Sequence, residues 1–502
     1  MKFIKKYQHL IIACFLFLII SIVYLYKIIP SYNYDSDFGR DLNDILQITR
    51  GKMSLIGPKL SFGGIHAGPY YYYLFAPVLK IFSLKPESMI IFNALIFLII
   101  LAISFGIILK SNLKNKYSWL LGATWIFLSP FMIYSGRRPG NAFSYLALLF
   151  VLLIIFPWVL NKNKLFLGLI YGFFVGVVIN FHLINLLIFT PLILITFVFY
   201  IFKKDWKKIL LTFLMCLGIL ISFGPLLLFE ARHNFVQFKN TFIDKSYIMF
   251  VDNKNLVDPL PTSSNRLLNF WLLQKHFTTW SQISFLVLFI LTIVLLIIRW
   301  KKIDFPTKIY IFSSLFAFIL LVLIAKSQVA IHYFFPFILA IQVSLIILIS
   351  NLSPKISSKI FLLFLIISLI KFPKWFYSPV TRTIDNYRNF TNKLTSSDLF
   401  KNIDSQINVF CARETPVAIL GWEYRYFMEL NGYKVLAPTL FNQANQLLII
   451  KEARNSDNID SLKSWELDEF GPRVLNKTIE IDGRKIFLFD KKTSSTPKQQ
   501  TR

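Results

Sequence analysis

The segment between positions 34 and 82 is denser than any other in this sequence in groups that could do chemistry. It contains four aspartates, two arginines, one histidine and four consecutive tyrosines. Its charged residues recur at helical spacing and therefore share one helix face: Asp37, Arg40, Asp41 and Asp44. Asp35 and Ser36 are suited to cap the N-terminus of that helix. The pattern predicts an amphipathic helix at a membrane surface, followed by an irregular loop over 51–69.

The carboxylates of this helix have two interpretations. A partly desolvated carboxylate can accept a proton from an incoming hydroxyl and act as a general base. Asp37 lies only a few residues beyond the first apolar run, in a loop whose glycines and tyrosines favour folding back onto other helices. A charged face on an outer helix is, in most proteins, simply solvated. Spacing alone leaves both interpretations open.

Cations and histidines near the ends of apolar runs form a second candidate group. Ionisable side chains at membrane depth are costly and are therefore functional candidates; the group comprises His66, Arg137, Arg138, His182, His233, Lys326 and His332. Arginine binds phosphate with two parallel hydrogen bonds, so Arg137, Arg138 and Lys326 would suit a lipid-linked phosphate at headgroup depth. The alternative is that these side chains only snorkel to lipid headgroups.

Aromatic residues and metal-binding patterns are less informative. The tyrosines from Tyr70 to Tyr73, with Phe75, suit either an interfacial aromatic belt or a platform for sugar rings. His66 has no HxH or HExxH partner that would define a metal site. The three cysteines are far apart in the sequence and predict neither a disulfide framework nor a cysteine metal site.

Composition shows that membrane helices must position these groups. Of 502 residues, 55% are hydrophobic and 16% charged, against about 25% charged in soluble domains. The 54 Lys and Arg exceed the 26 Asp and Glu, but they lie in short clusters between apolar runs, which favours span orientation over nucleic-acid binding. Eleven runs predict spans, at about 10–30, 88–109, 117–134, 142–160, 165–181, 183–202, 209–229, 281–298, 308–325, 333–350 and 356–372.

The loops predict how the chain is oriented. Lys and Arg concentrate in the N-terminal segment and in every second loop, whereas the short loops on the opposite side carry only Arg137, Arg138 and Lys326. By the positive-inside rule the N-terminus is cytoplasmic. The first loop (31–87), the 230–280 loop and the tail after 372 then share the outer face.

The tail predicts a small extracytoplasmic α/β domain over 373–490. Strands are expected over 417–420 and 435–437, around a helix over 422–431. Asp482 and Gly483, between apolar runs over 478–481 and 485–489, give a strong hairpin signal. The last residues, 491–502, are polar and expected to be disordered.

The first loop contains several short motifs: Asp37-Phe38-Gly39-Arg40-Asp41, Gly57-Pro58, Ser61, Gly63-Gly64 and His66-Ala67-Gly68-Pro69 followed by Tyr70, Tyr71, Tyr72, Tyr73 and Leu74. Together these motifs resemble those of C-type glycosyltransferases. The branch that they resemble contains bacterial relatives of protein O-mannosyltransferases and of the aminoarabinose transferase that modifies lipid A. The resemblance covers residues 1–372, and a later segment over 326–336, KSQVAIHYFFP, resembles the family's loop at the donor phosphate.

The resemblance implies an α-helical polytopic fold of the C type and an enzyme of the bacterial cytoplasmic membrane. Its expected reaction is inverting transfer of a sugar from a polyprenyl phosphate to a protein, lipid or cell-envelope glycan at the outer face. No nucleotide sugar or nucleic acid is expected as a partner. Some family members use a divalent metal, for which the sequence identifies no ligands.

The resemblance also implies roles for individual residues. Asp37 matches the catalytic acid of the family, and Arg40 and Asp41 follow it as partners. Lys326, His332 and Tyr333 match the donor-phosphate loop, to which the arginine pair is added. His66, Tyr70 and His182 are expected to contact substrate. The chain departs from the family at Phe38 and at 66–68, where relatives carry an acid pair or a basic residue.

Two other classes of function stay as alternatives. A transporter of lipid-linked sugars would also have many spans and intramembrane charges, but paired broken helices and midplane acids are not evident in this sequence. A polysaccharide polymerase or ligase would also use outer arginines, but such proteins usually carry their large outer loop late in the chain. The acidic loop directly after the first span favours the glycosyltransferase.

Overall fold

The computed structural model describes residues 2–60, 65–111, 113, 115–244, 277–324, 331–400, 406–412, 420–437, 440–452 and 464–492. The chain forms two compact units. The helical unit comprises Met1–Ile29 and Lys52–Ser378, and the sheet unit comprises Pro30–Gly51 and Pro379–Arg502. The expected disordered tail lies, after Lys492, outside the described residues.

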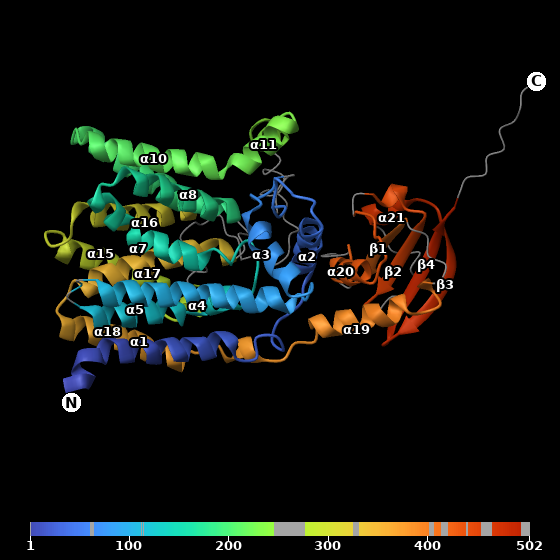
Figure 1. Ribbon diagram of the computed structural model, residues 1–502, viewed down its shortest axis with the longest axis horizontal. Coiled ribbons are helices and arrows are strands. Elements are labelled where there is room, and N and C mark those ends of the chain that lie inside the picture. The colour runs from blue at the N-terminus through green and yellow to red at the C-terminus, as the bar shows by residue number, and fades with distance from the viewer. Residues whose placement is uncertain are drawn as a thin grey trace, which may run out of the picture. The chain divides into compact units, whose positions relative to one another are not determined.

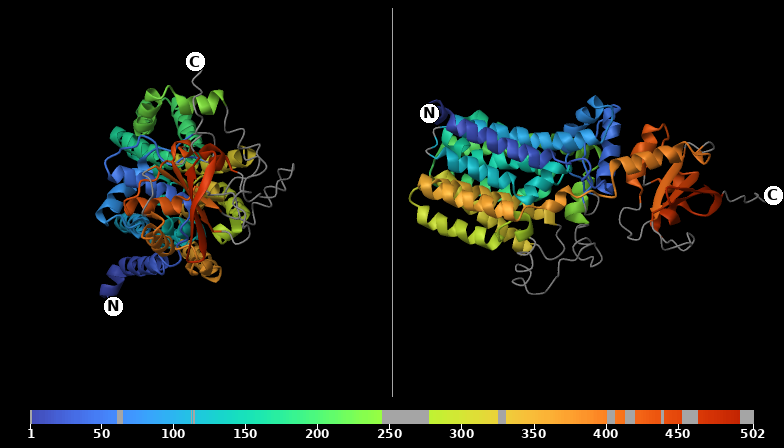
Figure 2. Two further views of the ribbon diagram at one scale, coloured as in Figure 1. Left: turned by 90° about the vertical axis from the view of Figure 1, so that its right-hand side faces the viewer. Right: turned by 90° about the horizontal axis from the view of Figure 1, so that it is seen from below.

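The helical unit is a bundle in which most helices run side by side (Figures 1 and 2). Its α-helices are α1 (Lys2–Leu25), α3 (Tyr70–Ile81), α4 (Glu87–Lys110), α5 (Lys116–Phe127), α6 (Pro130–Arg137), α7 (Leu146–Lys162), α8 (Leu165–Phe181), α9 (Leu186–Phe202), α10 (Trp206–Ser222), α11 (Gly224–Arg232), α12 (Val236–Phe238), α15 (Phe285–Arg299), α16 (Phe305–Ile324), α17 (Phe335–Ser350) and α18 (Pro354–Ile370). Short 3-10 or π turns complete it: η1 (Leu183–Asn185), η2 (Lys239–Ile243), η3 (Ile331–Phe334) and η4 (Lys374–Tyr377).

Each of the eleven expected spans contains a helix, and the chain is a multi-span membrane protein. Within the described residues, four helices are long and apolar enough to cross a membrane alone. Two bent pairs, α5 with α6 and α10 with α11, raise that number to six. The helices α7, α8, α15 and α16 are apolar but shorter.

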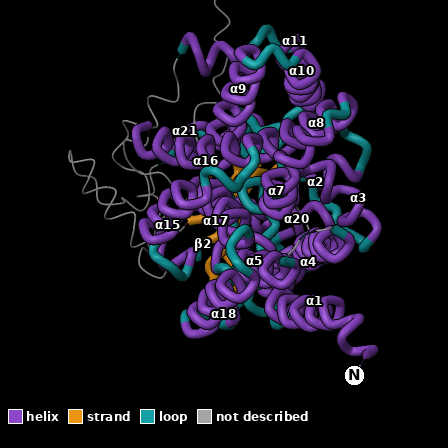
Figure 3. Tube along the Cα trace, turned by 90° about the vertical axis from the view of Figure 1, so that its left-hand side faces the viewer, coloured by secondary structure: helices purple, strands orange, loops and turns teal. Residues whose placement is uncertain are grey.

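Helix α17 lies at the centre of the bundle. All of its residues are buried, and it packs against α5, α7, α15, α16 and α18. Figure 3, which looks along the bundle, shows α17 surrounded by these neighbours. A helix that is apolar on every side is expected in such a place, because no face of it has to meet water.

Helices α8 and α10 pack closely because glycines remove the side chains between them. A Cβ added to Gly172 would lie 2.0 Å from the backbone oxygen of Met215, and one added to Gly168 would lie 2.6 Å from that of Leu211. Gly218 on α10 makes the reciprocal approach to Leu169. Glycines four residues apart allow two membrane helices to bring their backbones together.

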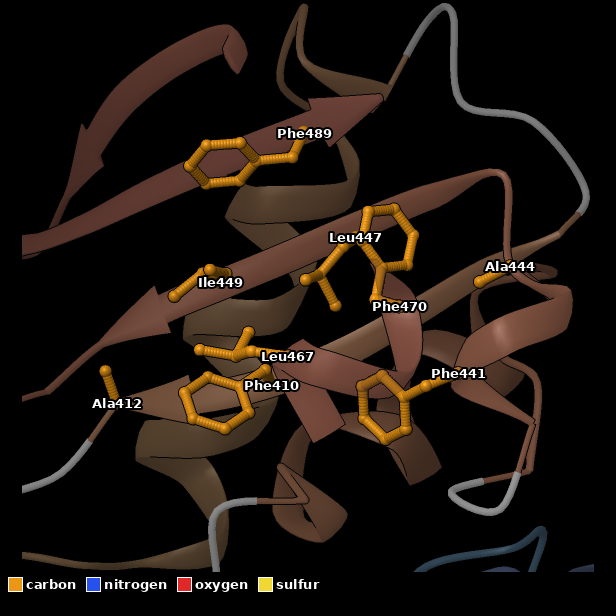
Figure 4. Packing of buried hydrophobic residues seen from close by; sticks show 9 residues of the cluster. All are labelled: Phe410, Ala412, Phe441, Ala444, Leu447, Ile449, Leu467, Phe470 and Phe489. Carbon is orange, nitrogen blue, oxygen red and sulfur yellow. The ribbon is translucent and has the colours of Figure 1, made fainter. Parts of the chain in front are cut away.

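The sheet unit is built on a four-stranded mixed sheet of order β1-β2-β4-β3. β1 (Ile407–Ala412) runs parallel to β2 (Gln446–Lys451), whereas β3 (Arg473–Ile481) and β4 (Arg484–Lys491) are antiparallel to their neighbours. One face of the sheet carries an apolar core of nine residues (Figure 4). The helices of the unit are α2 (Ser36–Thr49), α19 (Ile384–Thr395), α20 (Trp422–Leu430) and α21 (Trp465–Phe470), with the 3-10 turn η6 (Phe441–Gln443).

Two expectations for the tail are confirmed, and one needs correction. The hairpin turns at Asp482 and Gly483, whose φ angles of 49° and 73° suit the tight turn predicted there. The helix expected over 422–431 is α20. The strand expected over 435–437 is reduced to an isolated bridge between Val435 and Ile407, on the edge of β1 opposite to β2. Residues 417–419 lie outside the described part.

The amphipathic helix expected after the first span is α2, and it belongs to the sheet unit. The backbone N–H of Tyr34 donates to the carbonyl of Arg382, and that of Val380 donates to Pro30, so the two chain segments of the unit run together. The apolar side of α2 is buried in protein instead of lying in a membrane surface, since Phe38 is only 3% exposed.

Candidate functional site

Helix α2 presents its charged residues around Arg40. Asp35 caps the helix by accepting a hydrogen bond from the Phe38 N–H at 2.9 Å. Asp37 stands in the first turn with its side chain 75% exposed. The guanidinium of Arg40 lies between two carboxylates: Nη1 is 3.1 Å from Asp37 Oδ1, and Nη2 is 2.8 Å from Asp41 Oδ1. The arrangement leaves the Asp37 carboxylate open to solvent and held on one side by a cation.

The desolvated acid of this helix is Asp41. It is 3% exposed, and its burial raises the pKa of its carboxyl to about 7. The neighbouring carboxylates of Asp37 and Asp44 raise this pKa further, while Arg40 opposes them through its charge and hydrogen bonds. The expectation that one carboxylate is desolvated therefore applies to Asp41, and Asp37 is the accessible one.

In the helical unit, four of the predicted site residues lie together, and we call them the Arg138 cluster: Arg138, His182, His332 and Tyr333. The imidazole centroids of His182 and His332 are 5.7 Å apart, and the ring of Tyr333 lies 4.8 Å from His182 and 4.6 Å from His332. Arg138 is linked to the group through Phe143, whose ring is 5.5 Å from the guanidinium and 5.7 Å from His332.

Helix ends bring the Arg138 cluster together. Arg138 directly follows α6, His182 lies between α8 and η1, and His332 and Tyr333 form part of η3 just before α17. The Asn185 side chain fixes the turn at His182 by donating to the His182 carbonyl at 2.8 Å. Positions far apart in the sequence thereby meet at one end of these helices, where a cation and three hydrogen-bonding rings could hold an anion.

Arg137 points elsewhere, although it is the neighbour of Arg138 in the sequence. Its Nη1 donates to the carbonyls of Val23, Tyr24 and Tyr26 at 2.9 to 3.1 Å, and Nη2 reaches that of Lys27 at 3.3 Å. These carbonyls end α1, where the last turn of a helix lacks its own donors and carries partial negative charge. The observed geometry is that of a buried cap on α1.

His66 and Tyr70 contact the segment from α10 to α12. The His66 N–H donates to Gln237 Oε1, and the Tyr70 hydroxyl donates to the Ser222 carbonyl at 2.7 Å. The ring of Tyr70 packs edge to face with Tyr73. The tyrosine that packs near the cluster is Tyr71, because its ring lies 6.2 Å from Phe181, the residue before His182.

Other predicted residues fall outside the described part of the chain. They are Lys326, the motif residues Ser61, Gly63 and Gly64, and positions 245–276 of the loop expected over 230–280. Among the residues that the structure describes, His, Cys, Asp and Glu form no group of three that could hold a metal ion.

Sequence reasoning missed the aromatic residues that support Arg138. The Tyr134 hydroxyl accepts a hydrogen bond from Arg138 Nη1, and the rings of Tyr134 and Phe143 lie 5.4 and 5.5 Å from the guanidinium. Tyr134 is four residues before Arg138, a spacing that brings side chains together on a helix and could have identified it. Phe143 could not be found that way, because it lies after the end of α6, and only the turn of the chain between α6 and α7 brings its ring to Arg138.

Comparisons with known proteins identify the fold. Neither a protein-family model nor a curated protein sequence matches the chain. Two crystal structures of ArnT from Cupriavidus metallidurans do match in structure. The apo structure matches with a TM-score of 0.60 and 10% identity over 95% of this chain and 97% of that one. The structure bound to undecaprenyl phosphate matches with a TM-score of 0.55 and 11% identity, over 97% of this chain and 99% of that one. The chain therefore has the fold of ArnT, in agreement with the predicted resemblance.

Proposed function

We propose that this chain is an inverting glycosyltransferase that moves a sugar from a polyprenyl phosphate to the hydroxyl of an acceptor. The observation that carries the proposal is the meeting of Arg138 with His332 and Tyr333. The sequence resemblance assigned His332 and Tyr333 to the donor phosphate, and arginine chemistry at a span end independently suggested Arg138 for the same role. Support comes from the ArnT fold, since one of the matching ArnT structures holds undecaprenyl phosphate.

The Arg138 cluster is assigned to the phosphate of the donor. A guanidinium can pair with two phosphate oxygens at once, and the rings of Tyr134 and Phe143 fix its plane. His332 and Tyr333 would add neutral hydrogen-bond donors, and Lys326 is expected to join them. Arg137 is left out of this assignment because its donors are already directed at the end of α1.

The proposed reaction is a single displacement at the anomeric carbon. The acceptor hydroxyl loses its proton to the carboxylate of Asp37 as its oxygen bonds to the anomeric carbon. The bond between that carbon and the phosphate oxygen breaks, and the polyprenyl phosphate leaves with the electron pair. Its added charge is offset by Arg138 and Lys326. One displacement inverts the anomeric configuration and needs no covalent enzyme intermediate.

The location of the reaction is proposed from the distribution of basic residues, and the acceptor class from the family resemblance. We place the reaction at the outer face of the cytoplasmic membrane, because the basic residues predict a cytoplasmic N-terminus. The acceptor is a protein, lipid or cell-envelope glycan that presents a hydroxyl. His66, Tyr70 and His182 keep their assignment to substrate contact.

The test is release of free polyprenyl phosphate from a panel of polyprenyl-phosphate sugars by the purified protein in lipid nanodiscs. A membrane extract supplies acceptors. We expect Asp37→Asn to lower the rate of release by about 100-fold or more, because a general base contributes that much. Asp44→Asn is the matched control, since it removes an exposed aspartate from the same helix.

The two possible results separate the functions. If Asp37→Asn abolishes release and Asp44→Asn releases polyprenyl phosphate at the wild-type rate, the protein is a transferase, and the donor that is used identifies the sugar. Failure of the wild-type protein to release polyprenyl phosphate from every donor would overturn the proposal. The polymerase, ligase and transporter alternatives would then be tested.

A further inference from the structure

Helix α20 in the sheet unit contacts one face of α2, the face opposite to the exposed carboxylates. Asn43 Nδ2 donates to the Trp422 carbonyl at 3.2 Å, and Gln47 Nε2 donates to Glu429 Oε2 at 3.2 Å. Arg50 forms an ion pair with the same Glu429 carboxylate. Three side chains at successive turns of α2 are thereby fixed to the two ends of α20.

The first turns of the two helices meet without any side chain between them. A Cβ added to Gly39 would lie 2.9 Å from both the Glu423 backbone nitrogen and the Trp422 carbonyl carbon. Such a contact cannot be relieved by rotating a side chain, because both neighbours are backbone atoms. Gly39 therefore sets the distance between α2 and α20 two residues away from Asp37.

Helix α20 is itself fixed to the sheet by a buried arginine. Arg425 Nη2 donates to the Val409 carbonyl in β1 at 2.9 Å, and Nε and Nη1 donate to the carbonyls of Leu420 and Leu436 at 2.6 Å. Burial lowers the pKa of this guanidinium to about 9. A continuous series of contacts thus runs from β1 through α20 to the helix that bears Asp37.

We propose that Gly39 and Glu429 are positioning residues, through which the sheet unit holds α2 in the register that presents Asp37 to the acceptor hydroxyl. The inference rests on the proposed function, and it assigns the sheet unit a part in the chemical step. Neither residue touches substrate. A group displaced by about 1 Å can lose about 100-fold in rate, so fixing this helix has a direct catalytic consequence.

The experiment compares wild type, Glu429→Arg, the exchanged pair Arg50→Glu with Glu429→Arg, and Gly39→Ala, all as full chains in nanodiscs. Three quantities are measured: the turnover number for release of polyprenyl phosphate, the dissociation constant of polyprenyl phosphate alone, and hydrogen exchange of the α2 amides. Glu480→Arg, at an exposed position on β3, is the matched charge-reversal control.

We expect Glu429→Arg to lower the turnover number by about 10- to 100-fold and to speed exchange in α2, while the dissociation constant stays within about twofold. The exchanged pair should recover most of the turnover, because the ion pair is re-formed with its charges reversed. Gly39→Ala should show the same loss without such a rescue. Glu480→Arg should resemble wild type.

Several outcomes would overturn the inference. One is unchanged turnover while α2 exchanges faster, which would separate this helix from catalysis. Another is an equal loss of turnover and polyprenyl-phosphate affinity that the exchanged pair does not rescue, which would mean a general structural role. Absence of release by the wild-type protein would instead overturn the proposed function, and it is seen before any variant is made.

Discussion

Arg40 Nη2 lies 2.8 Å from the Asp41 carboxylate, and Asp41 is 3% exposed. The ion pair is thus solvated on the side of the arginine and buried on the side of the acid. Burial prevails over the attraction of Arg40, since the pKa of Asp41 is raised to about 7. A carboxyl group beside the proposed base therefore titrates close to neutral pH.

The pH dependence of stability tests this assignment. Because the pKa of Asp41 is about 7 in the folded state and 3.8 as its ordinary value, the folded protein binds the extra proton between these limits. The contribution of the protonated Asp41 carboxyl to the stability of the fold is therefore greatest below about pH 4, and it is lost as pH rises to about 7. Asp41→Asn should remove this loss, as seen in thermal unfolding in detergent between pH 5 and 8. Asp44→Asn, on the exposed side of α2, should still lose stability as pH rises. If Asp41→Asn showed the same pH dependence as wild type, the assignment would be contradicted.

The two adjacent arginines should differ in their effects. Arg137→Ala removes the donors to the last carbonyls of α1, so it should destabilise the protein by at least about 2 kcal/mol. Arg138→Ala should leave stability nearly unchanged and weaken binding of polyprenyl phosphate about tenfold or more, because a charge-assisted hydrogen bond is lost. Thermal unfolding and a binding titration on both variants measure the difference. If both variants bound polyprenyl phosphate as tightly as wild type, neither arginine would belong to the phosphate site.

The contact between α8 and α10 predicts strong sensitivity at Gly172. A methyl group there would lie 2.0 Å from the Met215 backbone oxygen, so Gly172→Ala should destabilise the helical unit by about 1 to 3 kcal/mol or more. Gly106→Ala is the control, because a Cβ at that position of α4 meets nothing within 4 Å. Detergent-solubilised variants compared by unfolding midpoint provide the measurement. Equal midpoints would show that the two helices can separate without cost.

Protease accessibility tests the predicted orientation. The basic loops predict a cytoplasmic N-terminus and an external sheet unit. Protease added to intact cells should therefore cleave the C-terminal tail after Lys492. Protection in cells together with cleavage in inverted vesicles would reverse the orientation, and would place the proposed reaction on the other face.

The sequence by itself determined the features that depend on neighbouring residues. Runs of apolar residues marked the eleven expected spans, each of which contains a helix, because a membrane span must satisfy its backbone internally and be apolar over its length. Helix α3 was not among them. The hairpin at Asp482 and Gly483 and the N-cap at Asp35 were also local, since each is specified by a few adjacent residues. The short motif around Asp37 and the segment of His332 and Tyr333 were enough to indicate a fold that the match to ArnT confirms.

Only the tertiary structure decided which residues meet. Arg137 and Arg138 have the same charge and adjacent positions, yet one caps α1 and the other joins His332 through Phe143. Asp41 is buried and Asp37 is exposed, although both belong to one helix face. Residues 30–51 join a unit whose remaining residues begin at Pro379. The physical reason is that burial and partners are set by segments hundreds of positions away, whose arrival no local period or turn signal encodes.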